Sequence, residues 1–261
     1  MEAFVRALLD DRPAVRVPWE GLARYIRPVP GTLVIALGAP GACKSLASLI
    51  WGVELAKAGD PVRLISLDTD PLTQGLRVVA NLTGHRVNDL AQDPKAWAAM
   101  LRKQKFPVRV IDTPISPEDV DEILQADTEF FGKPPAIVVV DDMRQIVRSP
   151  DYTTFEVGWN QLHRAARRNH TVVLALHHVH RGDSSAGKEP ISLSDGKYGG
   201  EYEAEIVLGL WRPVPTTLRV GILKNRFGLA DPSGDVYVDL EVDPARVQLS
   251  DFKPKGQQVI E

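Results

Sequence analysis

The sequence predicts an α/β fold, in which a mostly parallel β-sheet is flanked by helices and followed by C-terminal antiparallel β-hairpins. Two observations support this fold class. Between residues 31 and 176, short aliphatic runs of strand length alternate with stretches of helical periodicity, as in a parallel sheet with crossover helices. From residue 205 onward, three strand-like runs follow one another with only turn residues between them, which indicates hairpins.

Local patterns set the expected elements. Residues 136–140 are almost entirely β-branched, which is typical of a strand buried on both faces. Gly59 ends the helix that begins near Ser45, and Thr153 with Glu156 has the spacing of a capping box that opens another helix. Strands are expected at 32–37, 62–67, 108–111, 136–140, 171–176, 205–211, 217–223 and 235–240. Helices are expected at 45–58, 72–82, 94–104, 117–131 and 153–168.

The composition is that of a soluble globular protein with one large domain. The 261 residues are 44% hydrophobic and 25% charged, and their net charge of −3 argues against coating by nucleic acid while allowing a local basic patch. One cysteine permits no internal disulfide and fits a reducing, cytoplasmic compartment. No apolar run approaches the roughly 20 residues of a membrane-spanning helix. We expect an N-terminal helix and proline-rich arm at 1–30, an α/β domain at 31–250 and a polar tail at 251–261.

The segment Gly38-Ala-Pro-Gly-Ala-Cys-Lys-Ser45 lies between the first predicted strand and a predicted helix. Small residues there let backbone N–H groups turn toward an anion, and the helix aims its N-terminus at phosphates. This is the pattern of a phosphate-binding loop, in which Lys44 reaches the terminal phosphates of ATP and the Ser45 hydroxyl holds Mg²⁺. Cys43 stands where glycine is usual, and a plain turn into a core helix is the structural alternative. The expected nucleotide-binding residues are Gly38, Ala39, Pro40, Gly41, Ala42, Cys43, Lys44, Ser45 and Leu46.

Acidic residues follow two of the predicted strands. Asp141, with Asp142 beside it, ends a buried run, where a carboxylate can hold Mg²⁺ through water; a surface acidic pair is the alternative. Asp68 and Asp70 follow the strand 62–67, and Asp68, nearer to the strand end, is the expected base that orients the attacking water. A turn or a helix N-cap is the alternative for both of these acids.

Three histidines, His177, His178 and His180, follow the strand 171–176. A polar side chain at this point can contact the γ-phosphate of a bound nucleotide and report its presence to the following loop. A metal site is the less favoured alternative, because this spacing in a strand-to-loop segment does not converge on an ion as H-x-x-x-H does on a helix.

The phosphate-binding loop, the acidic strand ends and the histidine segment follow one another along the chain in the order found in the RecA-like ATPase core. They resemble most closely the motor domain of the DnaB-type replicative helicases. Ser66-Leu67-Asp68 is similar to the family's Ser-Leu-Glu, with a shorter aspartate in place of the catalytic glutamate. The segment 177–181 looks like the family's Ser-Gln-Leu-Asn-Arg, which implies that His178 replaces the glutamine sensor. The segment 201–208 is similar to the family's acidic stretch before Ala-Asp-Ile-Val-Leu. The segment 224–228 is similar to the family's Lys-x-Arg-Asn-Gly segment.

The resemblance implies a RecA-like domain that binds and hydrolyses ATP with Mg²⁺ between the subunits of a homo-oligomer, most simply a hexameric ring in a bacterial or phage-infected cell. It also implies that Lys224 and Arg226 reach the nucleotide of the neighbouring subunit as trans-acting fingers. A planar guanidinium suits this role, because phosphoryl transfer builds charge on equatorial oxygens. Two basic residues on a solvated β-turn are the alternative.

By the same resemblance, two loops face the channel of such a ring and contact single-stranded or forked DNA. Binding of the DNA backbone needs only a local basic stripe, and the loops 143–153 and 181–200 both carry basic residues. The expected DNA-contacting residues are Arg144, Arg148, Arg181, Lys188 and Lys197.

We therefore expect a compact DnaB-like DNA helicase. Three other functions stay open. The first is a RecA-like recombinase or loader ATPase that forms a filament on DNA. The second is a metal-dependent, structure-specific nuclease in which Asp68, Asp70, Asp141 and Asp142 gather two metal ions. The third is a nucleotide-dependent scaffold in which Cys43 and Asp68 leave little turnover.

Overall fold

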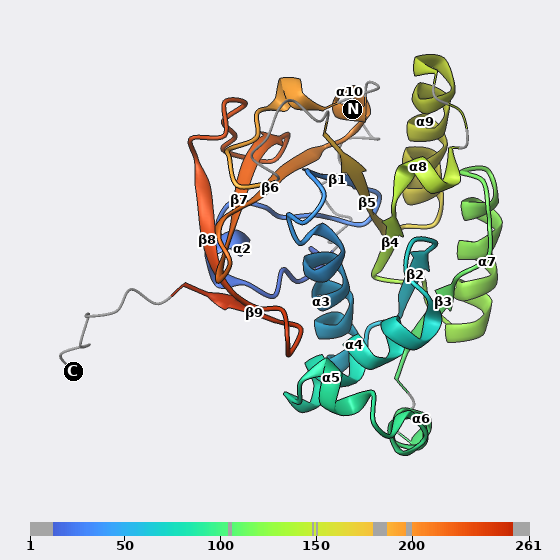
Figure 1. Cartoon of the computed structure of the whole chain (residues 1–261). Helices are drawn as coiled ribbons and strands as arrows, with labels where there is room; N and C mark the ends of the chain where they lie inside the picture. The colour runs from blue at the N-terminus through green and yellow to red at the C-terminus, as the bar shows by residue number, and fades with distance from the viewer. Residues whose placement is uncertain are drawn as a thin grey trace.

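The structure is a computed structural model that describes residues 13–103, 106–147, 149, 151–179, 187–196 and 200–252. Its centre is a sheet with the strand order β3-β2-β4-β5-β1-β6-β7-β8-β9 (Figure 1). The strands from β3 to β6 pair in parallel, and those from β6 to β9 pair antiparallel. The predicted fold class, a mostly parallel sheet followed by antiparallel hairpins, is confirmed.

The strands lie close to their predicted positions. The parallel part consists of β1 (Leu33–Gly38), β2 (Val62–Ser66), β3 (Val108–Ile111), β4 (Ile137–Asp141), β5 (Val172–His178) and β6 (Ile206–Val214). The antiparallel part adds β7 (Thr217–Asn225), β8 (Tyr237–Asp243) and β9 (Gln248–Asp251). The short edge strand β9 is missing from the sequence prediction, because its four residues carry no apolar alternation that would mark them.

Helices cover both faces of the sheet. One layer contains α3 (Lys44–Lys57), α4 (Pro71–Thr83), α5 (Val87–Leu90) and α6 (Pro94–Lys103), and α2 (Glu20–Ala23) packs beside β8. The other face is covered by α7 (Asp119–Phe131), α8 (Met143–Ile146) and α9 (Tyr152–Arg168). A 3₁₀ turn (Leu193–Asp195) and α10 (Gly200–Glu203) precede β6. Within the described residues, no helix has the length and apolar character needed to cross a membrane.

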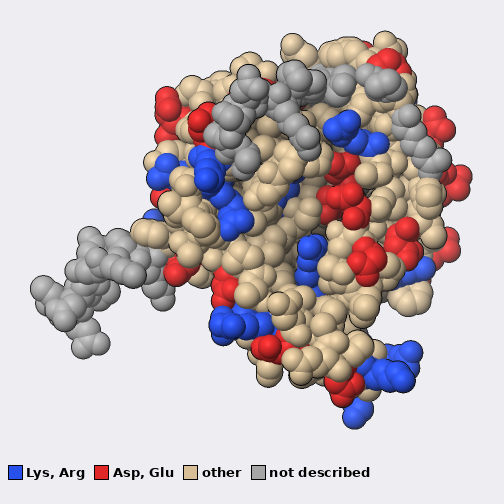
Figure 2. Space-filling model, in the orientation of Figure 1, with Lys and Arg blue, Asp and Glu red and all other residues tan. Residues whose placement is uncertain are grey.

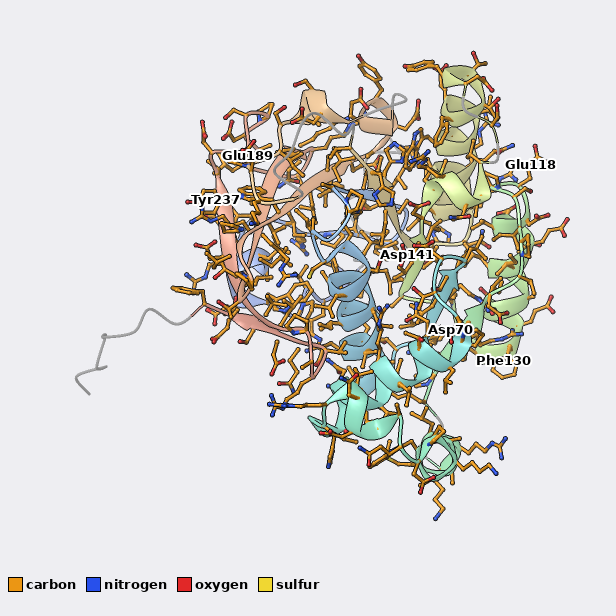
Figure 3. All side chains as sticks on the ribbon, viewed as in Figure 1. Asp70, Glu118, Phe130, Asp141, Glu189 and Tyr237 are labelled. Carbon is orange, nitrogen blue, oxygen red and sulfur yellow. The ribbon has the colours of Figure 1, made fainter. Side chains whose placement is uncertain are left out.

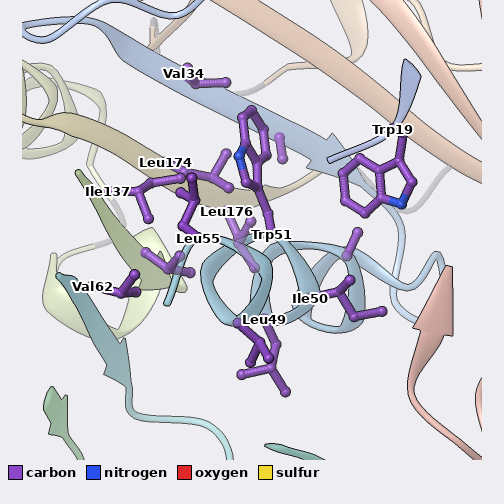
Figure 4. Packing of buried hydrophobic residues seen from close by; sticks show 14 of the residues in the cluster. Trp19, Val34, Leu49, Ile50, Trp51, Leu55, Val62, Ile137, Leu174 and Leu176 are labelled. Atoms are coloured by element: carbon purple, nitrogen blue, oxygen red, sulfur yellow. The ribbon is translucent and has the colours of Figure 1, made fainter. Parts of the chain in front are cut away.

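The helix α3 is the centre of the larger core cluster. Trp51 on α3 is buried and meets Trp19 edge-on, with ring centroids 6.2 Å apart (Figure 4). The Trp51 indole donates a hydrogen bond to the carbonyl of Arg16 at 2.9 Å. The described part of the proline-rich arm therefore packs on the domain, because its tryptophan fills the space beside α3. The expected helix at 2–10 lies outside the described residues.

The capping prediction for α9 is wrong by two residues. The N-cap is Asp151, whose carboxylate accepts a hydrogen bond from the backbone N–H of Thr154 at 2.9 Å, and the Thr153–Glu156 pair lies inside the helix. An ionised carboxylate is a stronger acceptor than a threonine hydroxyl, and it also favours the positive end of the helix dipole. This carboxylate therefore starts the helix earlier than the hydroxyl would.

A buried ion-pair cluster joins α7 to the outer parallel strands. Asp127 of α7 is fully buried and contacts two arginines, Arg63 on β2 and Arg109 on β3. The Arg63 Nε–H donates to Asp127 Oδ2 at 2.6 Å, and Arg109 Nη1 lies 2.9 Å from Oδ1. One carboxylate thus pairs with two guanidinium groups and ties α7 to the two strands.

Replacing Asp127 with alanine should lower the free energy of unfolding by about 3–5 kcal/mol, because the arginines would lose their buried partner. Urea denaturation followed by circular dichroism measures this change. The matched control is Lys133→Ala, which removes an exposed pair with Asp60 at 3.3 Å and should leave the midpoint near that of the parent. An Asp127→Ala midpoint equal to the control's would contradict the prediction.

Candidate functional site

The carboxyl ends of four parallel strands bring the predicted site residues to one edge of the sheet. Gly38 at the end of β1 pairs with His178 of β5 and with Leu210 of β6. Ser66 at the end of β2 pairs with Asp141 of β4. Acidic side chains gather on this face of the molecule (Figure 2), in the region where Asp141 and Asp70 are labelled in Figure 3. Ligands bind at this edge in open parallel sheets.

The phosphate-binding loop has two residues in the left-handed region just before α3. Gly41 has a φ of 82°, and Cys43, the N-cap of α3, has a φ of 61°. The second value explains why glycine is usual at this position, since a side chain in the left-handed region is sterically costly. The chain thus carries a side chain at Cys43 in a backbone conformation that favours glycine.

Lys44 is folded back onto its own loop. Its Nζ donates hydrogen bonds to the carbonyls of Gly38 and Ala39, at 2.7 and 3.1 Å, and it lies 3.3 Å from His178 Nδ1. Burial lowers the pKa of the Lys44 ammonium to about 8, against the opposing charges of Asp141 and Asp142. The ammonium thus occupies the concave side of the loop, where a terminal phosphate would take over the role of the two carbonyls.

The Ser45 hydroxyl lies close to the Asp141 carboxyl. The pKa of the Asp141 carboxyl is raised, mainly by burial and further by the negative charges of Asp142 and Asp68. The interaction with the Ser45 side chain acts in the opposite direction. Several oxygen atoms of Ser45 and the neighbouring acids thus lie close together. These are the hard donors that Mg²⁺ prefers, and the residues present fit that ion.

His178 connects the Asp141–Asp142 pair to the phosphate-binding loop. Its Nε2 lies 2.8 Å from Asp142 Oδ2, and its Nδ1 faces Lys44. Burial alone would raise the pKa of Asp142, but the hydrogen bond and charge of His178, with the charge of His177, lower it overall. Asp142 also caps α8 by accepting the N–H of Arg144 at 3.0 Å. The chain Asp142–His178–Lys44 thus links the ends of β4 and β5 to the loop after β1. His180 lies outside the described residues.

The two acids after β2 have different surroundings. Asp70 is the N-cap of α4 and accepts the backbone N–H of Thr73 at 2.9 Å, which favours the capping alternative for this residue. Asp68 is exposed, and its charge raises the pKa of Asp141. Asp68 is therefore close enough to Asp141 for its charge to act on that carboxyl, whereas Asp70 caps α4. With Asp70 on its helix and Asp142 on His178, two of the four acids of the nuclease alternative have other partners.

Lys224 and Arg226 lie at the other end of the strands. Lys224 pairs with Val207, which pairs with Ile35, so its backbone is about 10 Å along the strands from Gly38 and two strands away. Lys224 Nζ donates to the carbonyl of Glu201 at 2.5 Å, and Arg226 Nη2 donates to that of Tyr202 at 3.1 Å. These cations are therefore remote from the phosphate-binding loop of their own chain.

Arg212 is a neighbour of the loop that sequence reasoning missed. It lies on β6 two residues beyond Leu210, the partner of Gly38, and the charge of its guanidinium acts on Cys43. Burial raises the pKa of the Cys43 thiol, and Arg212 opposes this shift. The available signal was an arginine after a strand-like run, but the run was expected to end at 211, three residues before the end of β6, so Arg212 was left outside the strand.

The predicted DNA-contacting residues are only partly described. Arg144 on α8 and Lys188 are exposed. Gly187, next to Lys188, packs against Ala42 of the phosphate-binding loop: a Cβ at Gly187 would lie 3.3 Å from that of Ala42. This part of the second loop therefore touches the nucleotide site. Arg148, Arg181 and Lys197 lie outside the described residues.

Comparisons of sequence give two phage relatives. No family model matches the chain. The gene 65 protein of Mycobacterium phage L5 is 29% identical over 237 residues, which is 85% of this chain and 87% of the relative. The gene 65 protein of Mycobacterium phage D29 is also 29% identical over 237 residues, covering 84% of this chain and 99% of the relative.

Comparisons of structure identify the fold. The ATPase domain of G40P superposes with a TM-score of 0.78 and 17% identity, over 97% of this chain and 96% of that domain. A DnaB-like replicative helicase, solved in a study of its interactions with primase, gives a TM-score of 0.77 and 18% identity. The match covers 97% of this chain and 66% of the helicase chain. The chain therefore has the RecA-like fold of a DnaB-type motor domain, as its motifs predict.

Backbone strain at Cys43 predicts an unusual order of stability for two substitutions. Cys43→Gly should be more stable than Cys43→Ala by about 1 kcal/mol, because only glycine adopts a φ of 61° without a steric penalty. Thermal and urea unfolding of both variants measure the difference. The control is Ala47→Gly, inside α3, which should be less stable than the parent with its native alanine, so that the order of glycine and alanine is reversed there. Equal stability of the two Cys43 variants would contradict the strain argument.

Proposed function

We propose that this chain is a Mg²⁺-dependent ATPase acting on DNA, and specifically a compact DnaB-like helicase that works as a ring oligomer. The observation that carries the proposal is the meeting of Lys44, Asp141 and His178 around one phosphate-binding loop. The DnaB-type fold around this site supports the choice of helicase over other nucleotide hydrolases.

In this proposal the loop binds the triphosphate of ATP through its backbone N–H groups and the N-terminus of α3. Lys44 exchanges the carbonyls of Gly38 and Ala39 for phosphate oxygens, which restores a charged partner to a buried ammonium. Ser45 and Asp141 hold Mg²⁺, which neutralises charge on the phosphates when bound.

Asp68 orients the attacking water, and its exposed position after β2 keeps its carboxylate accessible to water. His178 senses the terminal phosphate. When the phosphate draws Lys44 away, His178 loses its contact with Nζ while keeping Asp142, so the end of β5 responds to the state of the nucleotide. Because the chain continues from β5 into the second predicted DNA loop, this response reaches residues that contact DNA.

Lys224 and Arg226 complete the site of a neighbouring subunit. Support comes from topology: both residues project from the end of the strands opposite their own loop. A finger that cannot serve its own nucleotide makes hydrolysis dependent on assembly, as a ring motor requires. Arg144, Arg148, Arg181, Lys188 and Lys197 are proposed to contact single-stranded or forked DNA through its phosphates.

The direct test is separation of a forked DNA duplex by the full chain. We expect ATP- and Mg²⁺-dependent release of one strand, and no release by Lys44→Ala, which lacks the loop cation. Strand exchange without unwinding would instead support a recombinase, and cleavage with Mg²⁺ or Mn²⁺ but no ATP would support a nuclease. Nucleotide binding without DNA-stimulated hydrolysis would support the nucleotide-dependent scaffold.

Mixing two inactive variants tests whether sites are shared between subunits. Lys44→Ala supplies intact fingers and Arg226→Ala supplies an intact loop, so mixed oligomers should regain a fraction of the parent's ATP hydrolysis. The control mixture combines Lys44→Ala with Ser45→Ala; both changes lie in the loop, and no activity should return. Absence of recovery in the first mixture, with assembly shown by analytical ultracentrifugation, would count against trans-acting fingers.

A further inference from the structure

Glu205 is the hub of a buried charge cluster beside Arg226. It lies directly before β6 and is 7% exposed. Its Oε2 accepts the backbone N–H of Leu33, at the start of β1, at 3.0 Å. Its Oε1 faces three cationic or titratable groups: His163 at 2.9 Å, Arg167 at 3.5 Å and Arg226 at 3.6 Å.

The carboxylate of Glu205 is the acid shared by these groups. Burial alone would raise the pKa of Glu205, but the close contact with His163, the hydrogen bond from the Leu33 N–H and the charges of His163 and Arg167 lower it overall. Glu203, the other nearby acid, lies 3.6 Å from Nδ1 of His163, on the other side of the imidazole ring. The ionised oxygen facing Arg226 is therefore that of Glu205.

Arg226 is bound to Glu205 through both backbone and side chain. The Arg226 N–H donates to the Glu205 carbonyl at 2.9 Å, while the guanidinium lies between the Glu205 carboxylate and the Tyr202 carbonyl. The Arg226 side chain remains 48% exposed, so its outer side is open toward solvent or a neighbouring molecule. Two acceptors on one side and free space on the other fix the direction in which the guanidinium points.

We propose that Glu205 is a positioning residue for Arg226, which sets the direction of the guanidinium before it meets the nucleotide of a neighbouring subunit. This inference rests on the trans-acting role proposed above. Position matters because a misplacement of about 1 Å in a catalytic group can cost about 100-fold in rate.

The geometry also lets Arg226 leave. At 3.6 Å the contact with Glu205 is an ion pair longer than a direct hydrogen bond, whereas His163 sits at hydrogen-bonding distance. When Arg226 moves toward a phosphate, His163 and Arg167 still face the carboxylate, so no buried charge is left without a partner. Glu205 therefore orients the finger without locking it in place.

The substitution Glu205→Gln tests this role with little structural change. A glutamine carbonyl can still accept the Leu33 N–H, so the anchor at β1 is kept while the charge that faces Arg226 is lost. With ATP, Mg²⁺ and a poly(dT) oligonucleotide, kcat should fall about 10- to 100-fold. The Kd for ATP should stay within about twofold, because the loop is intact. The matched control is Glu203→Gln, which faces His163 but not Arg226, and its kcat should equal the parent's.

Two further measurements separate positioning from a general structural role. In an Arg226→Ala background, Glu205→Gln should cause no further loss of kcat, whereas a structural defect would add to the loss. In mixtures, Glu205→Gln should be rescued by Lys44→Ala and not by Arg226→Ala, which assigns it to the finger group. If Glu205→Gln does not fold, Glu205→Asp is the second variant. It keeps the negative charge but moves the carboxylate back by one methylene, so its loss of kcat should be smaller than the loss expected for Glu205→Gln.

An unchanged kcat in a folded Glu205 variant, or rescue by Arg226→Ala, would overturn the inference. These results are distinct from failure of the proposed function. If Lys44→Ala and Arg226→Ala do not complement each other, the trans-acting role itself is wrong. If they complement each other but Glu205→Gln behaves as the parent, only the positioning role is wrong.

Discussion

Parallel pairing of β1, β2, β4 and β5 is the constraint on which the rest of this structure depends. Because all four strands run in one direction, the residues that follow them meet at one edge of the sheet, although they are separated by up to 140 positions in the chain (178 − 38). The helix α3 is held against these strands by its buried Trp51 and aims its N-terminus at the same edge. The backbone of the sheet thus positions the phosphate-binding loop, the carboxylates and the histidine.

Parallel pairing also brings charged groups of both signs together at that edge. Lys44 is a buried cation whose pKa is lowered by burial, and it faces Asp141 and Asp142, with His178 between the lysine and Asp142. The carboxylate oxygens near the loop suit a divalent cation, and the ammonium of Lys44 lacks a carboxylate partner within hydrogen-bonding distance among its described contacts. An anionic nucleotide together with Mg²⁺ would satisfy both groups at once.

The same sheet separates two sites within one subunit. The loop follows the carboxyl end of β1, whereas Glu205 and Arg226 lie beside its start, at Leu33. A strand of six residues thus has the nucleotide loop at one end and the predicted finger cluster at the other. In a head-to-tail assembly, this separation lets each subunit offer its loop on one side and its finger on the other. Glu205 ties the finger to the strand that carries the loop.

The sequence by itself determined the strands β1 to β8, α3, the phosphate-binding loop and the positions of Asp141 and His178, because each is marked by a local pattern of apolar runs, glycines or strand ends. Only the tertiary structure decided the rest. The φ of Cys43, the capping role of Asp70, the contact of Arg212 with the loop and the position of Glu205 among three elements depend on distant backbone geometry. A carboxylate or an arginine has the same local signature whether it caps a helix, holds a metal or orients another side chain. Its partners are set by the fold, and for these residues they come from strands and helices far away in the chain.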